Sequence, residues 1–88
     1  MGLSFPNASR SYDANQGWIR FWAYDNAREI PFFVESAALC QMDPRTGRDE
    51  TGLLNAFDVH RARICAAAER VYRRHRKGSY LLVAADMK

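Results

Sequence analysis

The chain has 88 residues, of which 48% are hydrophobic and 26% charged, with a formal net charge of +3. This length predicts a single domain spanning residues 1–88, and this composition excludes a disordered or fibrous protein. A chain this short buries only about 60 to 65% of the surface that its unfolded form exposes. We therefore expect it to form a homo-oligomer, because a second subunit can cover apolar surface that one chain cannot.

No targeting segment is recognisable. Residues 1–7 lack the basic and apolar regions of a signal peptide, and no apolar run approaches the ~20 residues that cross a bilayer. We expect a cytoplasmic protein without a membrane partner. Cys40 and Cys65 lie 25 positions apart without a CxxC motif. This spacing favours free thiols in or near the core, and we predict no metal and no cofactor.

The first half of the chain predicts strands. Residues 9–13 form a short edge strand, and residues 17–25 and 28–35 form a hairpin rich in aromatic and β-branched side chains. A two-residue loop at Asn26 and Ala27 brings the apolar sets of both arms onto one sheet face. The predicted apolar pairs are Ile19 with Val34, Phe21 with Phe32, and Ala23 with Ile30.

The opposite face of this hairpin is aromatic. The same register places Trp18, Arg20, Trp22 and Phe33 there, with Pro31 near an edge. The short helix, the N-terminal segment or another chain would have to cover these side chains. Aromatic residues with an interleaved arginine are typical of a protein interface, and they also suit base stacking. We favour packing, within the chain or between subunits, over stacking.

Residues 37–42 are predicted to form a short helix capped by Ser36, and the polar segment 43–52 follows it. This segment holds Gly and Arg, but it lacks GxxxxGK[ST] and follows a helix rather than a strand. We interpret it as a solvated connector and not as a phosphate-binding loop.

A single long helix is predicted over residues 51–77, with Gly78 as its C-cap. At 100° per residue, its apolar stripe faces the core. The stripe consists of Leu53, Phe57, His60, Ile64, Ala67, Ala68 and Val71. We interpret His60 as a core residue rather than a catalyst, and Asp58, two positions earlier, does not face it on a helix.

The positive charge is concentrated near the end of the chain. Residues 60–88 hold eight Lys or Arg and two Asp or Glu, a balance of +6, whereas residues 1–59 have a balance of −3. On the helical wheel, five cations form a basic flank: Arg63, Arg70, Arg73, Arg74 and Lys77. They either complement the helix dipole and keep the domain soluble, or they bind the phosphates of a nucleic acid or another anion.

The last element is a buried strand over residues 80–85. The predicted fold is therefore a two-layer α+β domain in which a small antiparallel sheet packs on one long helix. The expected order of elements is β-β-β-α-α-β.

Several segments resemble one family. They are residues 3–7, 9–13, 20–25, 29–34, 53–58, 78–80 and 85–86. They are similar to DUF1488, a bacterial family of small proteins of unknown function, and the resemblance covers nearly the whole chain. It implies a small α+β fold with a helix against an antiparallel sheet, and it supplies no established activity, cofactor or catalytic residue.

No catalytic constellation is present, because neither Ser36 nor Ser79 nor either cysteine has a base at a defined spacing. We predict a non-catalytic interaction or regulatory module, not an enzyme, that associates with itself. The alternative is a nucleic-acid-binding regulator that uses the basic flank. No small-molecule substrate is predicted.

Overall fold

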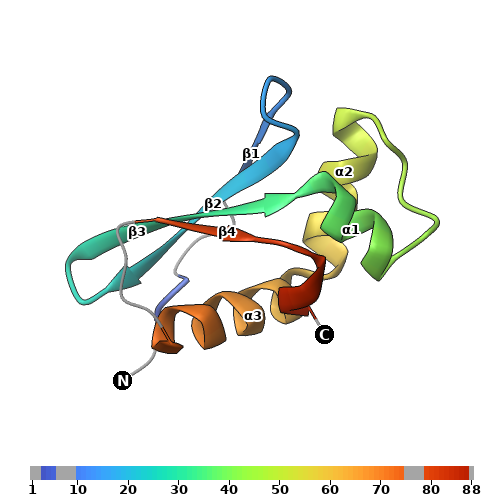
Figure 1. The fold of residues 1–88 in the computed structure, drawn as a ribbon. Coiled ribbons are helices and arrows are strands. Elements are labelled where there is room, and N and C mark those ends of the chain that lie inside the picture. The colour runs from blue at the N-terminus through green and yellow to red at the C-terminus, as the bar shows by residue number, and fades with distance from the viewer. Residues whose placement is uncertain (1–2, 6–9, 75–78, 88) are drawn as a thin grey trace.

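The computed structural model describes residues 3–5, 10–74 and 79–87. It contains a four-stranded sheet in the order β1-β2-β3-β4, with the helices on one face (Figure 1). The elements are β1 (Arg10–Asp13), β2 (Trp18–Asp25), β3 (Arg28–Glu35), α1 (Ser36–Met42), α2 (Glu50–Val59), α3 (Arg61–Arg74), β4 (Tyr80–Leu82) and the 3-10 turn η1 (Ala84–Met87). The predicted α+β class is confirmed.

The hairpin of β2 and β3 has the predicted register. Ile19 pairs with Val34, Phe21 with Phe32, and Ala23 with Ile30. Asn26, the first loop residue, has a φ of 59°, a left-handed conformation that asparagine tolerates better than most residues and that two-residue hairpin loops require. The predicted first strand is also present, because Arg10–Asp13 pairs antiparallel with β2.

The prediction of an all-antiparallel sheet is wrong for the last strand. β4 pairs with β3 in parallel, from Phe32 opposite Tyr80 to Val34 opposite Leu82. Because the chain crosses over through three helices between these strands, it returns to the sheet in the direction of β3. The strand is also shorter than predicted, since η1 begins at Ala84 and the Val83 N–H donates to the Asp86 carboxylate at 2.9 Å.

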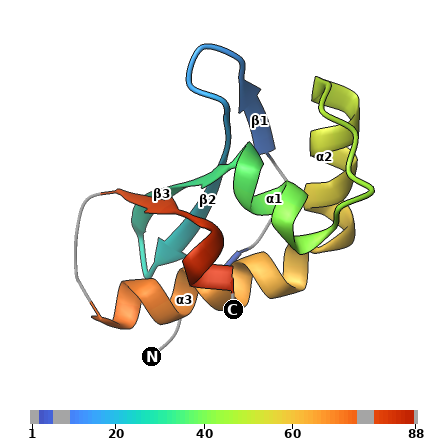
Figure 2. The same cartoon turned by 45° about the vertical axis from the view of Figure 1, so that its right-hand side comes forward.

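The prediction of a single long helix over residues 51–77 is also wrong. The chain forms α2 and α3, which join at His60 with φ −103° and ψ 18° (Figure 2). Neither Pro nor Gly lies at this joint, so the sequence carries no local signal for it. The bend directs two short stripes into one core. Residues of α2 and α3 that are buried there are Leu53, Ala56, Phe57, Ile64, Ala67, Ala68 and Tyr72. Lys77 and Gly78 lie outside the described residues.

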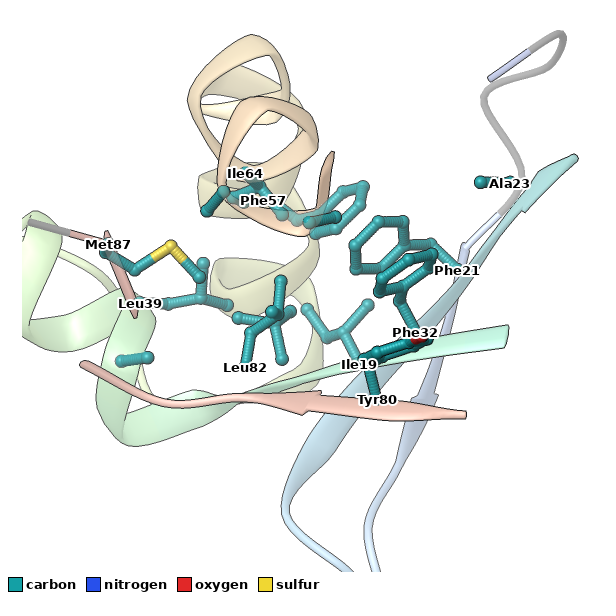
Figure 3. Close-up of a cluster of buried hydrophobic side chains, with 14 of the residues drawn as sticks. Ile19, Phe21, Ala23, Phe32, Leu39, Phe57, Ile64, Tyr80, Leu82 and Met87 are labelled. Carbon is teal, nitrogen blue, oxygen red and sulfur yellow. The ribbon is translucent and has the colours of Figure 1, made fainter. Parts of the chain in front are cut away.

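The core lies between the helices and one sheet face (Figure 3). Its centre is aromatic: the Phe21 ring lies 5.5 Å from that of Phe32 and 5.1 Å from that of Phe57, and Phe32 stacks on Tyr80 at 5.1 Å. Helix α1 adds two fully buried residues, Ala38 and Leu39, to the same core. It begins at Ser36 after the N-cap Glu35, and neither forms the side-chain cap predicted for Ser36.

Gly52 in the first turn of α2 occupies a tight site. Its N–H donates to Asp49 Oδ1 at 2.8 Å, and an added Cβ would lie 2.7 Å from the Gly47 Cα and 2.8 Å from that carboxylate. Gly→Ala in a helix normally stabilises by about 1 kcal/mol. Here we expect Gly52→Ala to lower the free energy of unfolding by about 1 to 3 kcal/mol, because the backbone at Gly47 must move to make room for the added methyl group.

Urea denaturation at one fixed protein concentration measures this effect. Gly47→Ala is the matched control, since its added Cβ would lie at ordinary contact distances of 3.4 Å. A Gly52→Ala variant at least as stable as the wild type would contradict this packing.

Candidate interaction surface

The sheet has a second face, which points away from the helices. We define the outer sheet face by the side chains that alternate with the core residues: Ser11, Asp13, Trp18, Arg20, Trp22, Tyr24, Glu29, Pro31, Phe33, Glu35 and Leu81. Within residues 3–5, 10–74 and 79–87, no helix packs on this face (Figures 1 and 2). Its aromatic side chains are half-buried, and Leu81 is 42% exposed.

The predicted interface residues lie together on this face. The rings of Trp18 and Phe33 are 4.8 Å apart, and the Arg20 guanidinium lies 5.0 Å from the centre of the Trp22 ring. The register explains both contacts, because Trp18 and Phe33 are diagonal neighbours across β2 and β3, and Arg20 and Trp22 are two residues apart on β2. The sheet therefore presents an aromatic surface with a cation held against it.

Among the described residues, neither the N-terminal segment, at positions 3–5, nor α1 covers this face. In the N-terminal segment, Ser4 pairs with Tyr24 at the sheet edge, and the Phe5 ring packs on the core side, 6.3 Å from that of Phe21. Helix α1 buries Ala38 and Leu39 in the core. The sequence suggested three ways to cover this face: the short helix, the N-terminal segment or another chain. Of these, another chain is the possibility that the described segments do not contradict.

The outer sheet face is acidic. On the described strands it carries the carboxylates of Asp13, Glu29 and Glu35 and one cation, Arg20. An excess of carboxylates repels a phosphate backbone, so this face is poorly suited to stacking the bases of a nucleic acid.

The outer sheet face is also hollowed at one end. A hollow of 480 Å³ lies where the turn after β1 meets Trp18 and Phe33.

The predicted basic flank has structural partners that the sequence did not reveal. Arg63 donates to the Met87 carbonyl at 3.1 Å, and Arg70 donates to the Asp86 carbonyl at 2.6 Å. These two arginines thus hold η1 against α3. Arg73 pairs with Glu69 at 3.4 Å on its own helix. Arg74 lines a small hollow with Arg70 and Asp86, and Lys77 lies outside the described residues.

The titratable residues considered as possible catalysts lie in separate contacts. Asp58 accepts two hydrogen bonds from Arg10, at 2.9 and 2.8 Å. His60 is half-buried, and its Nε2 lies 3.3 Å from the Asp43 carboxylate. Burial raises the pKa of the Cys65 thiol, and the nearby Arg61 opposes this shift only in part. A raised pKa makes a thiol a poor nucleophile at neutral pH.

The contact between Asp43 and His60 predicts a pH dependence of stability. The His60 hydrogen bond, followed by that of the Arg45 backbone N–H, holds the pKa of Asp43 below its ordinary value of 3.8. A carboxyl whose pKa is lowered by folding stabilises the protein above that ordinary value, and this stabilisation is lost as the pH falls through the lower, folded-state pKa. Asp43→Asn should therefore destabilise the protein near neutral pH and lose this effect in acid.

Urea denaturation of both proteins between about pH 7 and about pH 2 measures this difference. Glu50→Gln, a change at an exposed carboxyl in the first turn of α2, is the control. A destabilisation by Asp43→Asn that stays constant down to the lowest pH would show that the carboxylate charge is not its cause.

The described residues hold no group of three or more His, Cys, Asp or Glu side chains placed to bind a metal ion. None of the helices described combines the length and the apolar character that crossing a bilayer requires.

Comparison with known proteins places the chain by family and fold. The sequence model of the family described as "Protein of unknown function (DUF1488)" matches residues 3–82. A crystal structure of a protein of unknown function from the DUF1488 family of Shewanella loihica PV-4 is similar, with a TM-score of 0.80 and 17% identity over 91% of this chain and 90% of the other. The search of curated proteins finds no match. The chain belongs to the DUF1488 family, whose function is unknown.

Proposed function

We propose that this protein is a non-catalytic interaction module that associates with itself through the outer sheet face. The observation that supports this proposal is the pairing of Trp18 with Phe33 and of Arg20 with Trp22 on a sheet face without a helix over it in the described residues. Exposed clusters of aromatic residues with arginine are the typical composition of binding hot spots.

The size of the face sets the expected affinity. Strands of 4, 8, 8 and 3 residues form a flat surface of roughly 350 Å² at about 4.8 Å between strands and 3.3 Å per residue. Complete overlap of two such faces would bury at most about 700 Å² of flat sheet, plus the area of the rings that stand on it, and crossed sheets would bury less, against about 1,200 Å² at the lower limit of stable complexes. We therefore expect a dimer with a micromolar dissociation constant.

A non-catalytic role fits the separate contacts of the titratable groups. Asp58 is engaged by Arg10 and His60 by Asp43, so neither is directed at the other or at a cysteine. A nucleophile needs a base within hydrogen-bond reach, and within the described parts of the chain these pairings place neither Asp58 nor His60 in that role for Cys65.

Binding of a nucleic acid is the second candidate, and Arg70 and Arg74 favour it. Both are exposed and line one hollow, and a hydrogen bond to a carbonyl leaves the charge of Arg70 in place. Asp86 lines the same hollow, however, and Glu69 accepts from Arg73. These carboxylates reduce the local positive charge, so this flank is the weaker candidate.

Sedimentation equilibrium separates the two functions. From about 1 to about 200 µM protein, we expect a reversible change from monomer to dimer. The dimer should persist between about 50 and about 500 mM salt, because its core is apolar. A strict monomer throughout would refute self-association.

The same protein should be titrated with DNA and RNA over this salt range. Binding that weakens steeply with salt, and further on replacing Arg70 and Arg74 with Glu, would favour the nucleic-acid regulator instead. We expect no such binding.

A further inference from the structure

Any chain that covers the outer sheet face must supply a hydrogen-bond acceptor for Arg20. This arginine lies on Trp22 and has no ion pair among residues 3–5, 10–74 and 79–87. Covering the face removes water from the guanidinium, and a buried charge without a partner is strongly unfavourable. A partner that binds here must therefore bring an acceptor, and a carboxylate is the best match for a guanidinium.

Of the three carboxylates that the described strands place on the outer sheet face, Glu35 is the one without a hydrogen bond to another described residue. Asp13 Oδ1 already accepts the backbone N–H groups of Asn15 and Gln16, at 3.0 and 3.3 Å. Glu29 accepts from the Tyr24 hydroxyl at 3.5 Å. Glu35 makes no side-chain hydrogen bond within the described parts of the chain, and it ends β3 opposite Trp18. Within the described chain, this face thus carries a cation without an ion pair, Arg20, and a carboxylate without a hydrogen bond, Glu35.

This combination favours a second copy of the same chain as the partner. In a two-fold dimer each contact occurs twice, so a surface that holds both halves of an ion pair complements itself. The apolar rings between the two charges supply the rest of the contact. A partner lacking a carboxylate at this position would leave Arg20 buried and unpaired.

The register of the hairpin then fixes the symmetry axis. Trp18, Glu35, Phe33 and Arg20 occupy the corners of one block of neighbouring positions on β2 and β3. Arg20 and Glu35 form one diagonal of this block, and the stacked rings of Trp18 and Phe33 form the other. A two-fold axis that exchanges Arg20 with Glu35 must run along the second diagonal, so each ring lies near its own counterpart.

Building on the proposed self-association, we propose that two copies pack their outer sheet faces about a two-fold axis over Trp18 and Phe33. Two reciprocal ion pairs join Arg20 of each copy to Glu35 of the other. Because the axis runs diagonally across the strands, the two sheets cross at a steep angle, as in orthogonal sheet packing.

Charge exchange tests this arrangement. Arg20→Glu and Glu35→Arg should each weaken the dimer at least about tenfold, because each places two like-charged pairs at the interface. A 1:1 mixture of the two variants should form a heterodimer with close to wild-type affinity, since both of its pairs are then opposite in charge. Sedimentation equilibrium of the separate variants and of the mixture measures all three affinities.

Arg45→Glu, at a site whose side chain is 93% exposed in the loop after α1, controls for net charge and should leave dimerisation unchanged. Because Glu35 precedes α1, circular dichroism must verify that each variant is folded. The neutral variants Arg20→Gln, Glu35→Gln and their double form supply a second test, in which the double variant should lose less affinity than the two single losses combined.

A mixture that associates no better than its components, together with additive neutral variants, would overturn the reciprocal pairing. The proposed function would survive that result if the wild type still dimerised through its aromatic face. A monomeric wild type would instead refute self-association itself, so the two failures are distinguishable.

Discussion

Phe32→Ala is expected to lower the free energy of unfolding by about 3 to 5 kcal/mol, the largest effect of a single change that we predict. The Phe32 side chain is fully buried, and its ring packs against those of Phe21 and Tyr80. The cost combines lost transfer energy with the cavity that remains. Small domains have only about 5 to 15 kcal/mol of stability in total, so the variant should be close to unfolding.

Phe33→Ala is the matched control, because the same residue type occupies the next position on the opposite face. Phe33 is half-buried, with Trp18 as its ring partner. We expect this variant to lose less than about 1 kcal/mol when both are compared by urea denaturation below the dimerisation range. Equal losses for the two variants would mean that the outer sheet face is packed within the monomer.

Trp18→Ala is expected to raise the dissociation constant of the dimer about 30- to 150-fold. Trp18 lies against Phe33 at 4.8 Å, on the diagonal that we assign to the symmetry axis. Truncating a central aromatic residue of an interface typically costs 2 kcal/mol or more, and 1.4 kcal/mol corresponds to a factor of ten. Sedimentation equilibrium measures the change.

Val59→Ala is the control for this experiment. Val59 is 76% exposed at the end of α2, on the helical layer rather than on the sheet face. Its replacement should leave the dimer intact. If Val59→Ala dissociated the dimer while Trp18→Ala did not, the interface would lie on the helices.

The hairpin could be predicted residue by residue because local rules determine it. Two apolar sets in alternation and a two-residue loop allow one register, and that register also places Trp18, Arg20, Trp22 and Phe33 on one face. The residues of the candidate surface could therefore be predicted from the sequence. The sequence could not predict that no described helix lies over this surface, since that depends on where α1 and α2 pack.

The errors concern contacts between distant segments. The wheel of one long helix identified Leu53, Phe57 and Ile64 correctly as core, but no local signal marks the bend at His60. The direction of β4 follows from the path of the chain after β3 and not from its own residues. The sequence assigns Arg63 and Arg70 to a basic flank, because it cannot show that the carbonyl groups of η1 accept hydrogen bonds from them.

The most direct test of self-association through the outer sheet face uses the two tryptophans of the chain. Both Trp18 and Trp22 lie on that face, so their fluorescence reports on its exposure. Acrylamide quenching should be measured along a dilution series through the dimer-to-monomer transition. We predict that quenching increases as the dimer dissociates. Dissociation without any change in quenching would place the interface elsewhere and contradict this assignment.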